Sequence, residues 1–404
     1  MTESPPETVD SDGTSGGHER PVLITGGAGF IGTNLAHRLA GEGRRVLVLD
    51  DLSRPGVERN LEWLLEEHPD RVEVEEANVL DARAVRRAIE RAAEVYHLAA
   101  QVAVTTSLDS PVLDFEVNAR GTLNVLEAIR AREDPPPLLY TSTNKVYGAL
   151  SDIDLMKEGG RYVPQDARVR ASGIDEGRPL DFHSPYGCSK GAADQYVLDY
   201  ARCFGLAAIV FRMSCIYGPH QCGNEDQGWV AHFLRSAREG RPLTLYGDGC
   251  QVRDVLYVED LIEAFRRAMF QIARLRGRAF NIGGGPQNSL SLNELTEWLA
   301  RRYGHTLHIE RSSWRNGDQR YYVSNTARFR AATGWSPQVA AGRGIALLDE
   351  WLASASVSPA GEAARRRRGP ARGADGEVGN VGEPATSRVP EPRAPEARTR
   401  AALP

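Results

Sequence analysis

Cysteine is scarce in this sequence, and its distribution offers no pairing pattern. There are five cysteines among 404 residues, Cys188, Cys203, Cys215, Cys222 and Cys250, and no two of them form a Cys-x-x-Cys pair. An odd number of scattered cysteines argues against a disulfide framework and against a zinc site. We therefore expect free thiols in a reducing compartment and no bound metal.

Long apolar runs and a strong net charge are also missing. No apolar stretch is long enough to cross a bilayer, and residues 1–20, MTESPPETVDSDGTSGGHER, are polar and acidic where a signal peptide would be apolar. The formal net charge is -5, with 41% hydrophobic and 25% charged residues. Such a chain has no global attraction to nucleic acid or to an anionic membrane. We expect a globular cytoplasmic protein that binds neither.

Aromatic residues are absent from the last part of the chain. After Ala353 there is no Phe, Tyr or Trp, and nine Arg, including the run Arg365 to Arg368, stand against six acidic residues. A basic segment without apolar or aromatic residues is typical of a solvated tail rather than of a nucleic-acid site. Residues 1–19 are equally aperiodic and polar. Two disordered tails, 1–19 and 354–404, are therefore predicted on either side of a folded region.

The folded region alternates short apolar runs with helical patterns. Ile31, Leu35 and Leu39 recur at helical spacing and are followed by Gly41 and Gly43, which end the helix. The apolar runs, each rich in aliphatic residues, are 21–26, 44–50, 72–77, 95–100, 137–143 and 207–214. Regular alternation of strand and helix predicts an α/β fold with a doubly wound parallel sheet, the Rossmann architecture.

The pattern changes after Tyr217. The segments YGPHQCGNEDQGW and LTLYGDGCQVRDV are typical of loops, and a later helix begins with a capping box formed by Ser291 and Glu294. A smaller C-terminal domain that covers the ligand edge of the sheet is therefore predicted. The predicted division gives residues 20–216 and 251–282 to the Rossmann domain, and residues 217–250 and 283–353 to the substrate domain.

The first predicted strand ends in TGGAGFIG, which places Gly26, Gly29 and Gly32 three residues apart. Glycines at this spacing allow a tight turn and let the backbone approach a pyrophosphate at the N-terminus of the next helix. Asp50 follows at the end of the second predicted strand, where an acid binds the hydroxyl groups of the adenosine ribose. A carboxylate there repels a 2′-phosphate, so the predicted cofactor is NAD rather than NADP.

Tyr186 and Lys190 in HSPYGCSK are four residues apart and so share one face of a helix. A phenol with its usual pKa near 10 is a poor base, but a neighbouring ammonium and the positive nicotinamide would lower that pKa. Tyr186 could then take the proton of a sugar hydroxyl while the adjacent carbon gives a hydride to NAD. Thr143, at the end of the predicted strand 137–143, completes the candidate set.

These motifs together resemble the extended short-chain dehydrogenase/reductase family of nucleotide-sugar epimerases and dehydratases. The resemblance rests on the glycine loop, HLAAQ at 97–101, TSTNKVYG at 141–148, SPYGCSK at 184–190 and QVRDVLYVEDL at 251–261, and it covers about residues 20 to 352. It implies that Thr143, Tyr186 and Lys190 are the catalytic residues and that NAD stays bound through the catalytic cycle. A homo-oligomer, dimer or tetramer, is also implied.

The resemblance extends to the binding residues. The residues implied to contact NAD are Gly26, Gly29, Phe30, Ile31, Gly32, Asp50, Asn78, Val79, Leu98, Ala99, Ala100, Thr141, Tyr186, Lys190 and Met213. The residues implied to contact the substrate are Gln101, Thr143, Asn144, Lys145, Arg253 and Arg320. Both arginines suit a clamp on the substrate's phosphates, or alternatively each pairs with Asp254 or Asp318 to hold a loop. Asn78 stands where many members of the family have Asp.

The two residues after Thr143 separate the possible reactions. Sugar 4,6-dehydratases of the family have Asp and Glu there and use them to eliminate water, whereas this chain has Asn144 and Lys145. The pair therefore disfavours elimination and favours epimerisation, which needs only oxidation and reduction. STNKVYG, the insert 149–180, DQGWV and GDQR resemble most closely the CDP-paratose 2-epimerase group, which implies inversion at C2 of a CDP-3,6-dideoxyhexose. Met213 departs from the His expected in that group.

Other functions stay open on the sequence alone. The nearest is a UDP-sugar 4-epimerase of the same family, and a decarboxylase is less favoured because no clamp for a uronic acid is evident. A different class is an NAD-binding protein that interacts with a partner without catalysis. The joint presence of Thr143, Tyr186 and Lys190 argues against that class, and only the Arg-rich tail argues for it.

Overall fold

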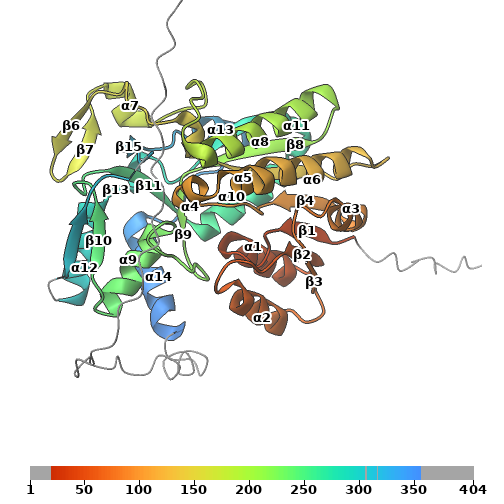
Figure 1. Cartoon of the computed structure of the whole chain (residues 1–404), viewed down its shortest axis with the longest axis horizontal. Coiled ribbons are helices and arrows are strands. Elements are labelled where there is room, and N and C mark those ends of the chain that lie inside the picture. Colours follow the sequence, from red (N-terminus) through yellow and green to blue (C-terminus); the bar gives the residue numbers. More distant parts are fainter. Residues whose placement is uncertain (1–19, 305–306, 316, 356–404) are drawn as a thin grey trace, which may run out of the picture. The chain divides into compact units, whose positions relative to one another are not determined.

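A computed structural model of the chain describes residues 20–355, apart from 305–306 and 316 (Figure 1). The disorder predicted for 1–19 and for 356–404 lies outside the described residues. The predicted boundary at 354 is two residues early, because the last helix, α14, continues through Ala355. None of the helices in the described part of the chain is both long and apolar enough to cross a lipid bilayer.

A seven-stranded sheet forms the centre of the N-terminal part, and every neighbouring pair of its strands is parallel. Its strands are β1 (Val22–Thr25), β2 (Val46–Asp50), β3 (Val72–Glu76), β4 (Glu94–His97), β5 (Leu138–Thr143), β8 (Ala208–Met213) and β12 (Ala279–Ile282). Their order in the sheet is β12-β8-β5-β4-β1-β2-β3. The six predicted strands and the doubly wound Rossmann fold are confirmed, and β12 is a seventh strand that the sequence did not reveal.

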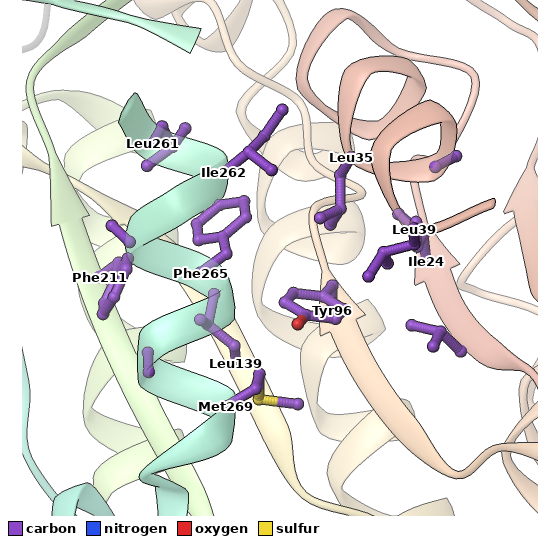
Figure 2. Packing of buried hydrophobic residues seen from close by; sticks show 14 of the residues in the cluster. Ile24, Leu35, Leu39, Tyr96, Leu139, Phe211, Leu261, Ile262, Phe265 and Met269 are labelled. Atoms are coloured by element: carbon purple, nitrogen blue, oxygen red, sulfur yellow. The ribbon is translucent and has the colours of Figure 1, made fainter. Parts of the chain in front are cut away.

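Helices cover both faces of this sheet, because successive strand residues point to opposite sides. One face carries α1 (Phe30–Gly41), α2 (Val57–Glu67) and α10 (Val258–Phe270), and the other carries α3 (Ala82–Arg91), α6 (Gly121–Arg130) and α8 (Ser184–Cys203). Figure 2 shows the first face, where Phe265 and Met269 of α10 and Leu35 and Leu39 of α1 surround Tyr96 of β4. These side chains are at most 7% exposed. Such burial stabilises the fold by about 1.5 to 3 kcal/mol for each large apolar side chain.

The strand order places a ligand site between β1 and β4. The chain runs from β1 through β2 to β3 on one side of the sheet, and β4 then pairs with the other side of β1. Where the order reverses in this way, a crevice opens at the carboxyl ends of the two strands. The glycine loop follows β1 and the segment HLAAQ ends β4, so both motifs meet at this reversal.

The C-terminal part has a separate four-stranded sheet in which β11 pairs with β9, β13 and β15. Its strands are β9 (Cys215–Tyr217), β11 (Val252–Tyr257), β13 (Ser289–Ser291) and β15 (Tyr321–Tyr322). A hydrophobic cluster of its own includes Tyr217, Leu234, Leu245, Leu299 and Leu348. This core supports a second domain, although β11, which the prediction assigned to the Rossmann domain, lies outside the seven-stranded sheet. The division into two domains stays a prediction.

The remaining elements connect these sheets or pack on them. They are α4 (Val104–Asp109), α5 (Pro111–Phe115), the π-helix η1 (Glu116–Arg120), the 3-10 helix η2 (Asn144–Tyr147), β6 (Leu155–Glu158), β7 (Arg161–Pro164), α7 (Ala167–Ser172), α9 (Trp229–Arg238), β10 (Leu243–Tyr246), α11 (Ile272–Leu275), the 3-10 helix η3 (Pro286–Asn288), α12 (Leu292–Tyr303), β14 (Ile309–Ser312), α13 (Ala327–Thr333) and α14 (Ala341–Ala355). β6 and β7 form a hairpin inside the insert 149–180, and β10 pairs with β14. The predicted capping box of Ser291 and Glu294 at the start of α12 is confirmed.

Candidate active site

The loop between β1 and α1 brings backbone very close to backbone. Gly26 has a φ of +70°, and a Cβ there would lie 2.7 Å from the backbone nitrogen of Ala99. A Cβ on Gly32 would lie 2.4 Å from the carbonyl oxygen of Gly26. Glycine is therefore required at both positions. No side chain caps α1 at Gly29 and no acid occupies its first turn, so its N-terminal N–H groups can bind an anion.

Asp50 ends β2 and turns its carboxylate toward the glycine loop. Its Oδ2 accepts a hydrogen bond from the backbone N–H of Ala28, and its Oδ1 accepts one from that of Leu52, both at 3.0 Å. Burial raises the pKa of this carboxyl, and the two hydrogen bonds oppose the rise. Asn78 donates to Oδ2 of Asp51 at 2.6 Å and so joins the same edge of the site. An acid beside an uncapped helix end fits the adenosine ribose and the pyrophosphate of NAD.

The segment after β4 continues along the glycine loop. Leu98 donates its backbone N–H to the carbonyl oxygen of Thr25 at 3.0 Å, and Ala99 donates to Thr25 Oγ1 at 3.2 Å. The amide of Gln101 bonds within its own loop, to the backbone oxygen of Ala103 at 3.0 Å and to its N–H at 2.8 Å. The other predicted NAD residues lie nearby in sequence: Phe30 and Ile31 open α1, Val79 follows β3, and Ala100 follows Ala99.

The predicted catalytic residues meet where β5 ends beside α8. Thr143 is the last residue of β5 and Tyr186 is the third residue of α8, and Thr143 lies close enough to lower the pKa of the phenol. Lys190 follows one turn later and is only 3% exposed. Its Nζ donates to the carbonyl oxygen of Thr141 at 2.6 Å and lies 4.3 Å from the ring centre of Tyr140. The structure thus brings the three residues together, while their catalytic role stays a prediction.

Burial dominates the electrostatics of Tyr186 and Lys190. It raises the pKa of Tyr186 to about 12, although Thr143 lowers it; Asp114 raises it further and Arg54 lowers it. Burial also lowers the pKa of Lys190 to about 7, although nearby carboxylates raise it. Burial therefore outweighs the charges of the protein's own groups at Tyr186, and the lower pKa expected from Lys190 and the nicotinamide together stays a prediction.

Asn144 and Lys145, which follow Thr143, reach across to the segment 317–319. Asn144 donates its side-chain N–H to Oε1 of Gln319 at 3.4 Å. Lys145 donates from Nζ to the carbonyl oxygen of Gly317 at 3.2 Å. Both side chains are therefore engaged in contacts that join the β5 edge to the C-terminal part of the chain.

Arg253 on β11 is buried and paired with a carboxylate. Its Nη2 donates to Oδ1 of Asp318 at 2.6 Å and to the carbonyl oxygen of Gln319 at 2.5 Å. Nζ of Lys145 lies 4.0 Å from the same Asp318 oxygen. Burial and then the charge of Arg253 lower the pKa of Lys145 to about 8, and Asp318 opposes this. The pairing with Asp318 is the loop-holding alternative considered above, so a phosphate role for Arg253 stays a prediction.

Arg320 differs from Arg253 because it is exposed. Its guanidinium carbon lies 5.5 Å from the ring centre of Trp314 and 5.8 Å from that of Tyr162. Stacking on two aromatic rings orients a guanidinium without neutralising it. Arg320 therefore keeps its charge free for an anionic ligand.

Met213 ends β8 beside the catalytic strand. It pairs in register with Thr143 of β5 on one side and with Ile282 of β12 on the other. Its side chain is half-buried. A thioether without a proton to exchange therefore occupies the position where an imidazole is expected in the CDP-paratose 2-epimerase group.

Arg54 faces the same site, although no sequence motif pointed to it. Its charge lowers the pKa of both Asp50, on the adenosine side, and Tyr186, on the catalytic side. Its Nη2 also donates to Oε1 of Gln227 at 2.5 Å, across a sequence separation of 173 residues. An arginine four residues after Asp50 fits no general motif, and its contact with Gln227 depends on the fold.

Comparison with known proteins agrees with this geometry. The model of the NAD dependent epimerase/dehydratase family matches residues 22–283. The chain is 44% identical over 340 residues to a CDP-paratose 2-epimerase of Salmonella typhi, covering 82% of this chain and 99% of that protein. It is 33% identical over 336 residues to a UDP-glucose 4-epimerase of Mycolicibacterium smegmatis, covering 83% and 99%.

A solved structure with the cofactor is also similar. The UDP-glucose 4-epimerase of Thermus thermophilus, a complex with NAD, superimposes with a TM-score of 0.69 and 33% identity over 83% of this chain and 99% of that one. The glycine loop, Asp50 and the uncapped end of α1 fit the same cofactor. The chain belongs to the NAD dependent epimerase/dehydratase family and is an enzyme that uses NAD.

Proposed function

We propose that this enzyme is a nucleotide-sugar epimerase that inverts C2 of a CDP-3,6-dideoxyhexose, converting CDP-paratose to CDP-tyvelose through a transient keto sugar. The observation that carries the proposal is the 44% identity, over 340 residues, to a CDP-paratose 2-epimerase. The residues after Thr143 support it, because Asn144 and Lys145 cannot act as the carboxylic acid and carboxylate of an elimination. The reaction is oxidation and reduction at one carbon.

Tyr186 is the base in this proposal. The phenol takes the proton of the C2 hydroxyl, and Thr143, which lies beside the phenol, holds the same hydroxyl. A bound NAD would supply the hydride acceptor and donor for C2, and its positive ring would favour the phenolate that burial opposes. Lys190, one turn away, adds its positive charge below pH about 7. Inversion requires the flat keto group to present its other face before the proton and hydride return.

Five polar side chains are assigned to the substrate, two to its diphosphate and three to its sugar. We propose that Arg320, whose guanidinium is exposed, binds the diphosphate. Arg253 joins it if the phosphate replaces Asp318, its present partner. We assign Lys145 and Asn144, which follow Thr143 in the chain, and Gln101, which follows β4, to the sugar.

Proton NMR in D2O tests the reaction directly. The purified enzyme is incubated with CDP-paratose, and in parallel with UDP-glucose. New signals of the C2-inverted sugar without deuterium at C2 are expected, because the hydride never exchanges with solvent. Deuterium at C2 would contradict the mechanism, since it indicates inversion by proton abstraction from carbon.

The variant Tyr186→Phe tests the base. It removes the phenolic oxygen and keeps the ring, so the bound NAD content should persist while turnover falls by about 100-fold or more. NAD released by denaturation provides the control for an intact cofactor site. Full turnover with NAD still bound would exclude Tyr186 as the base.

A UDP-sugar 4-epimerase is the second candidate. It is supported by the 33% identity to the Mycolicibacterium smegmatis UDP-glucose 4-epimerase. Inversion at C4 of UDP-glucose in the parallel NMR sample would favour it and leave the roles of Thr143, Tyr186 and Lys190 unchanged. A non-catalytic role would require that neither sugar react although NAD is bound.

We also propose that the enzyme is a homo-oligomer. Large apolar side chains are exposed on α4, α5 and α8, which pack together: Leu108, Val112, Leu113, Phe115 and Tyr196 are 46% to 74% exposed. A contiguous apolar surface on a monomer is typical of an interaction site. Light scattering should give a mass of two or more chains, and Val112→Glu should reduce it to one.

A further inference from the structure

The carboxylate of Asp114, on the short helix α5, is buried against the catalytic helix. Its exposed fraction is 0%, although its neighbours Leu113 and Phe115 are 50% and 53% exposed. α5 packs against α8 (Figure 1), and Asp114 faces α8, because it accepts a hydrogen bond from Ser189 of that helix. A buried carboxylate is costly unless hydrogen bonds and a positive charge compensate it.

Asp114 contacts α8 at the residue between Tyr186 and Lys190. Its Oδ2 accepts a hydrogen bond from Oγ of Ser189 at 2.5 Å, and its Oδ1 accepts one from the side-chain N–H of Asn118 at 3.1 Å. Asn118 also donates to Ser189 Oγ at 3.0 Å. Both carboxylate oxygens thus receive donors, which is the pattern of an ionised carboxylate. These bonds supply hydrogen-bond donors but no positive charge.

The buried cation nearest in the chain is Lys190, the residue after Ser189. The groups that face it are the carbonyl oxygen of Thr141 and the ring of Tyr140 on β5, His97 on β4, Asp194 on α8, and Asp114 on α5. Of these groups, Asp194 and Asp114 are the carboxylates, and both raise the pKa of Lys190. Their two charges together oppose the burial that lowers the pKa of Lys190.

Asp194 is already neutralised by another residue. Arg212 donates to its Oδ2 from Nε at 2.9 Å and to its Oδ1 from Nη2 at 2.8 Å, in a bidentate pair that is 5% and 0% exposed. Asp114 differs, because the donors to its oxygens are the uncharged side chains of Ser189 and Asn118. Both aspartates therefore raise the pKa of Lys190, Asp194 more than Asp114, and Asp114 is the one whose hydrogen-bond donors are uncharged.

We infer that Asp114 is a positioning residue that keeps Lys190 protonated and thereby sets the pH range of catalysis. The inference rests on the proposed roles of Tyr186 and Lys190. The negative charge of Asp114 stabilises the ammonium of Lys190 and disfavours the phenolate of Tyr186. It therefore raises the pKa of both groups. Removing it should therefore lower both pKa values together.

The variant Asp114→Asn tests this while keeping an acceptor for Ser189. The whole pH profile of turnover should move to lower pH by about one unit, the size of shift that one neighbouring charge produces. Asp199→Asn is the matched control, because it removes the same charge from an exposed site of α8, where the side chain is 47% exposed. Its profile should coincide with that of the wild type. A uniformly slower Asp114→Asn enzyme with an unshifted profile would overturn the inference and leave a purely structural role.

A second measurement needs no substrate. Urea unfolding at pH 6 of the wild type, Asp114→Asn, Lys190→Met and the double variant forms a double-mutant cycle. If the two charges interact, Asp114→Asn should destabilise the wild type more than it destabilises Lys190→Met. Equal effects in both backgrounds would overturn the inference. Because the cycle does not depend on turnover, it tests Asp114 even if the proposed substrate proves wrong. A wild type that is inactive on both sugars would count against the proposed function alone.

Discussion

Breaking the buried pair of Arg212 and Asp194 should destabilise the enzyme strongly. The pair joins β8 to the catalytic helix α8 through two hydrogen bonds at 2.8 and 2.9 Å, and Nη1 of Arg212 also donates to the hydroxyl of Tyr147 at 3.2 Å. Arg212→Met keeps most of the side chain's length and removes all of these donors. Asp194, 0% exposed, then keeps its charge without its partner.

The expected loss follows from the burial of that charge. Removing one member of a buried pair costs about 3 to 5 kcal/mol, because the other charge is left uncompensated. Gln195 still donates to Oδ1 of Asp194 at 2.9 Å, so we expect a value near the lower end of that range. With a urea dependence of about 3 kcal/mol per molar, the unfolding midpoint should fall by about 1 M.

The double variant Asp194→Leu/Arg212→Met is the matched control. It replaces both charges by apolar side chains, which in buried pairs is often neutral or stabilising. Urea unfolding followed by circular dichroism should therefore place the double variant closer to the wild type than Arg212→Met. The reasoning would be refuted if Arg212→Met lost less than about 1 kcal/mol of unfolding free energy. It would also be refuted if the double variant lost as much as Arg212→Met and Asp194→Leu together.

Three further changes probe the cofactor and substrate sides. Gly26→Ala should purify with little NAD, because its Cβ would lie 2.7 Å from the backbone nitrogen of Ala99; an unchanged NAD content, measured by absorbance after denaturation, would contradict this. Arg54→Ala should lose NAD faster on dilution while its unfolding midpoint stays, since it removes both the charge that faces Asp50 and the bond to Gln227. Lys145→Met should raise KM at pH 7, and because the pKa of Lys145 is about 8 its charge is lost above that pH, so the difference from the wild type should shrink as the pH rises further.

Most of the central sheet could be predicted because six of its seven strands carry their own signal. Six strands are apolar runs followed by helical patterns, and local sequence suffices to find them. The strand β12 has only four residues, and the strands of the four-stranded sheet have between two and six. The pairing of Val252 with Tyr321 joins segments far apart in the chain. Such pairings depend on the folded structure rather than on any local period.

One hairpin was within reach of the sequence. β6 and β7 flank Gly159 and Gly160, both with positive φ, and a Gly-Gly pair between two short runs is a standard hairpin signal. Residues 149–180 were identified only as a long insert. No strand was predicted there, because β6 is largely exposed and lacks the apolar alternation of a core strand. The signal for the turn was present without the signal for the strands.

The candidate site divides in the same way. Thr143, Tyr186 and Lys190 lie in local motifs, so the sequence predicts them as a group. The pKa of Tyr186 depends instead on how deeply the phenol is buried, and the contacts of Arg54 and Asp114 depend on elements that meet only in the folded chain. The sequence therefore reveals which groups could react and leaves their charge states to the structure.

The charge state of Lys190 can be tested from two sides at once. Arg212→Met frees the negative charge of Asp194, which raises the pKa of Lys190 and should move the pH profile of turnover to higher pH. Asp114→Asn removes a negative charge and should move the profile to lower pH. Combining the two should bring the profile back toward that of the wild type, because the opposing shifts add. Distortion of the site would slow each variant without shifting its pH profile in a defined direction. A double variant whose pH profile returns to that of the wild type would therefore indicate electrostatic control of Lys190 rather than structural damage.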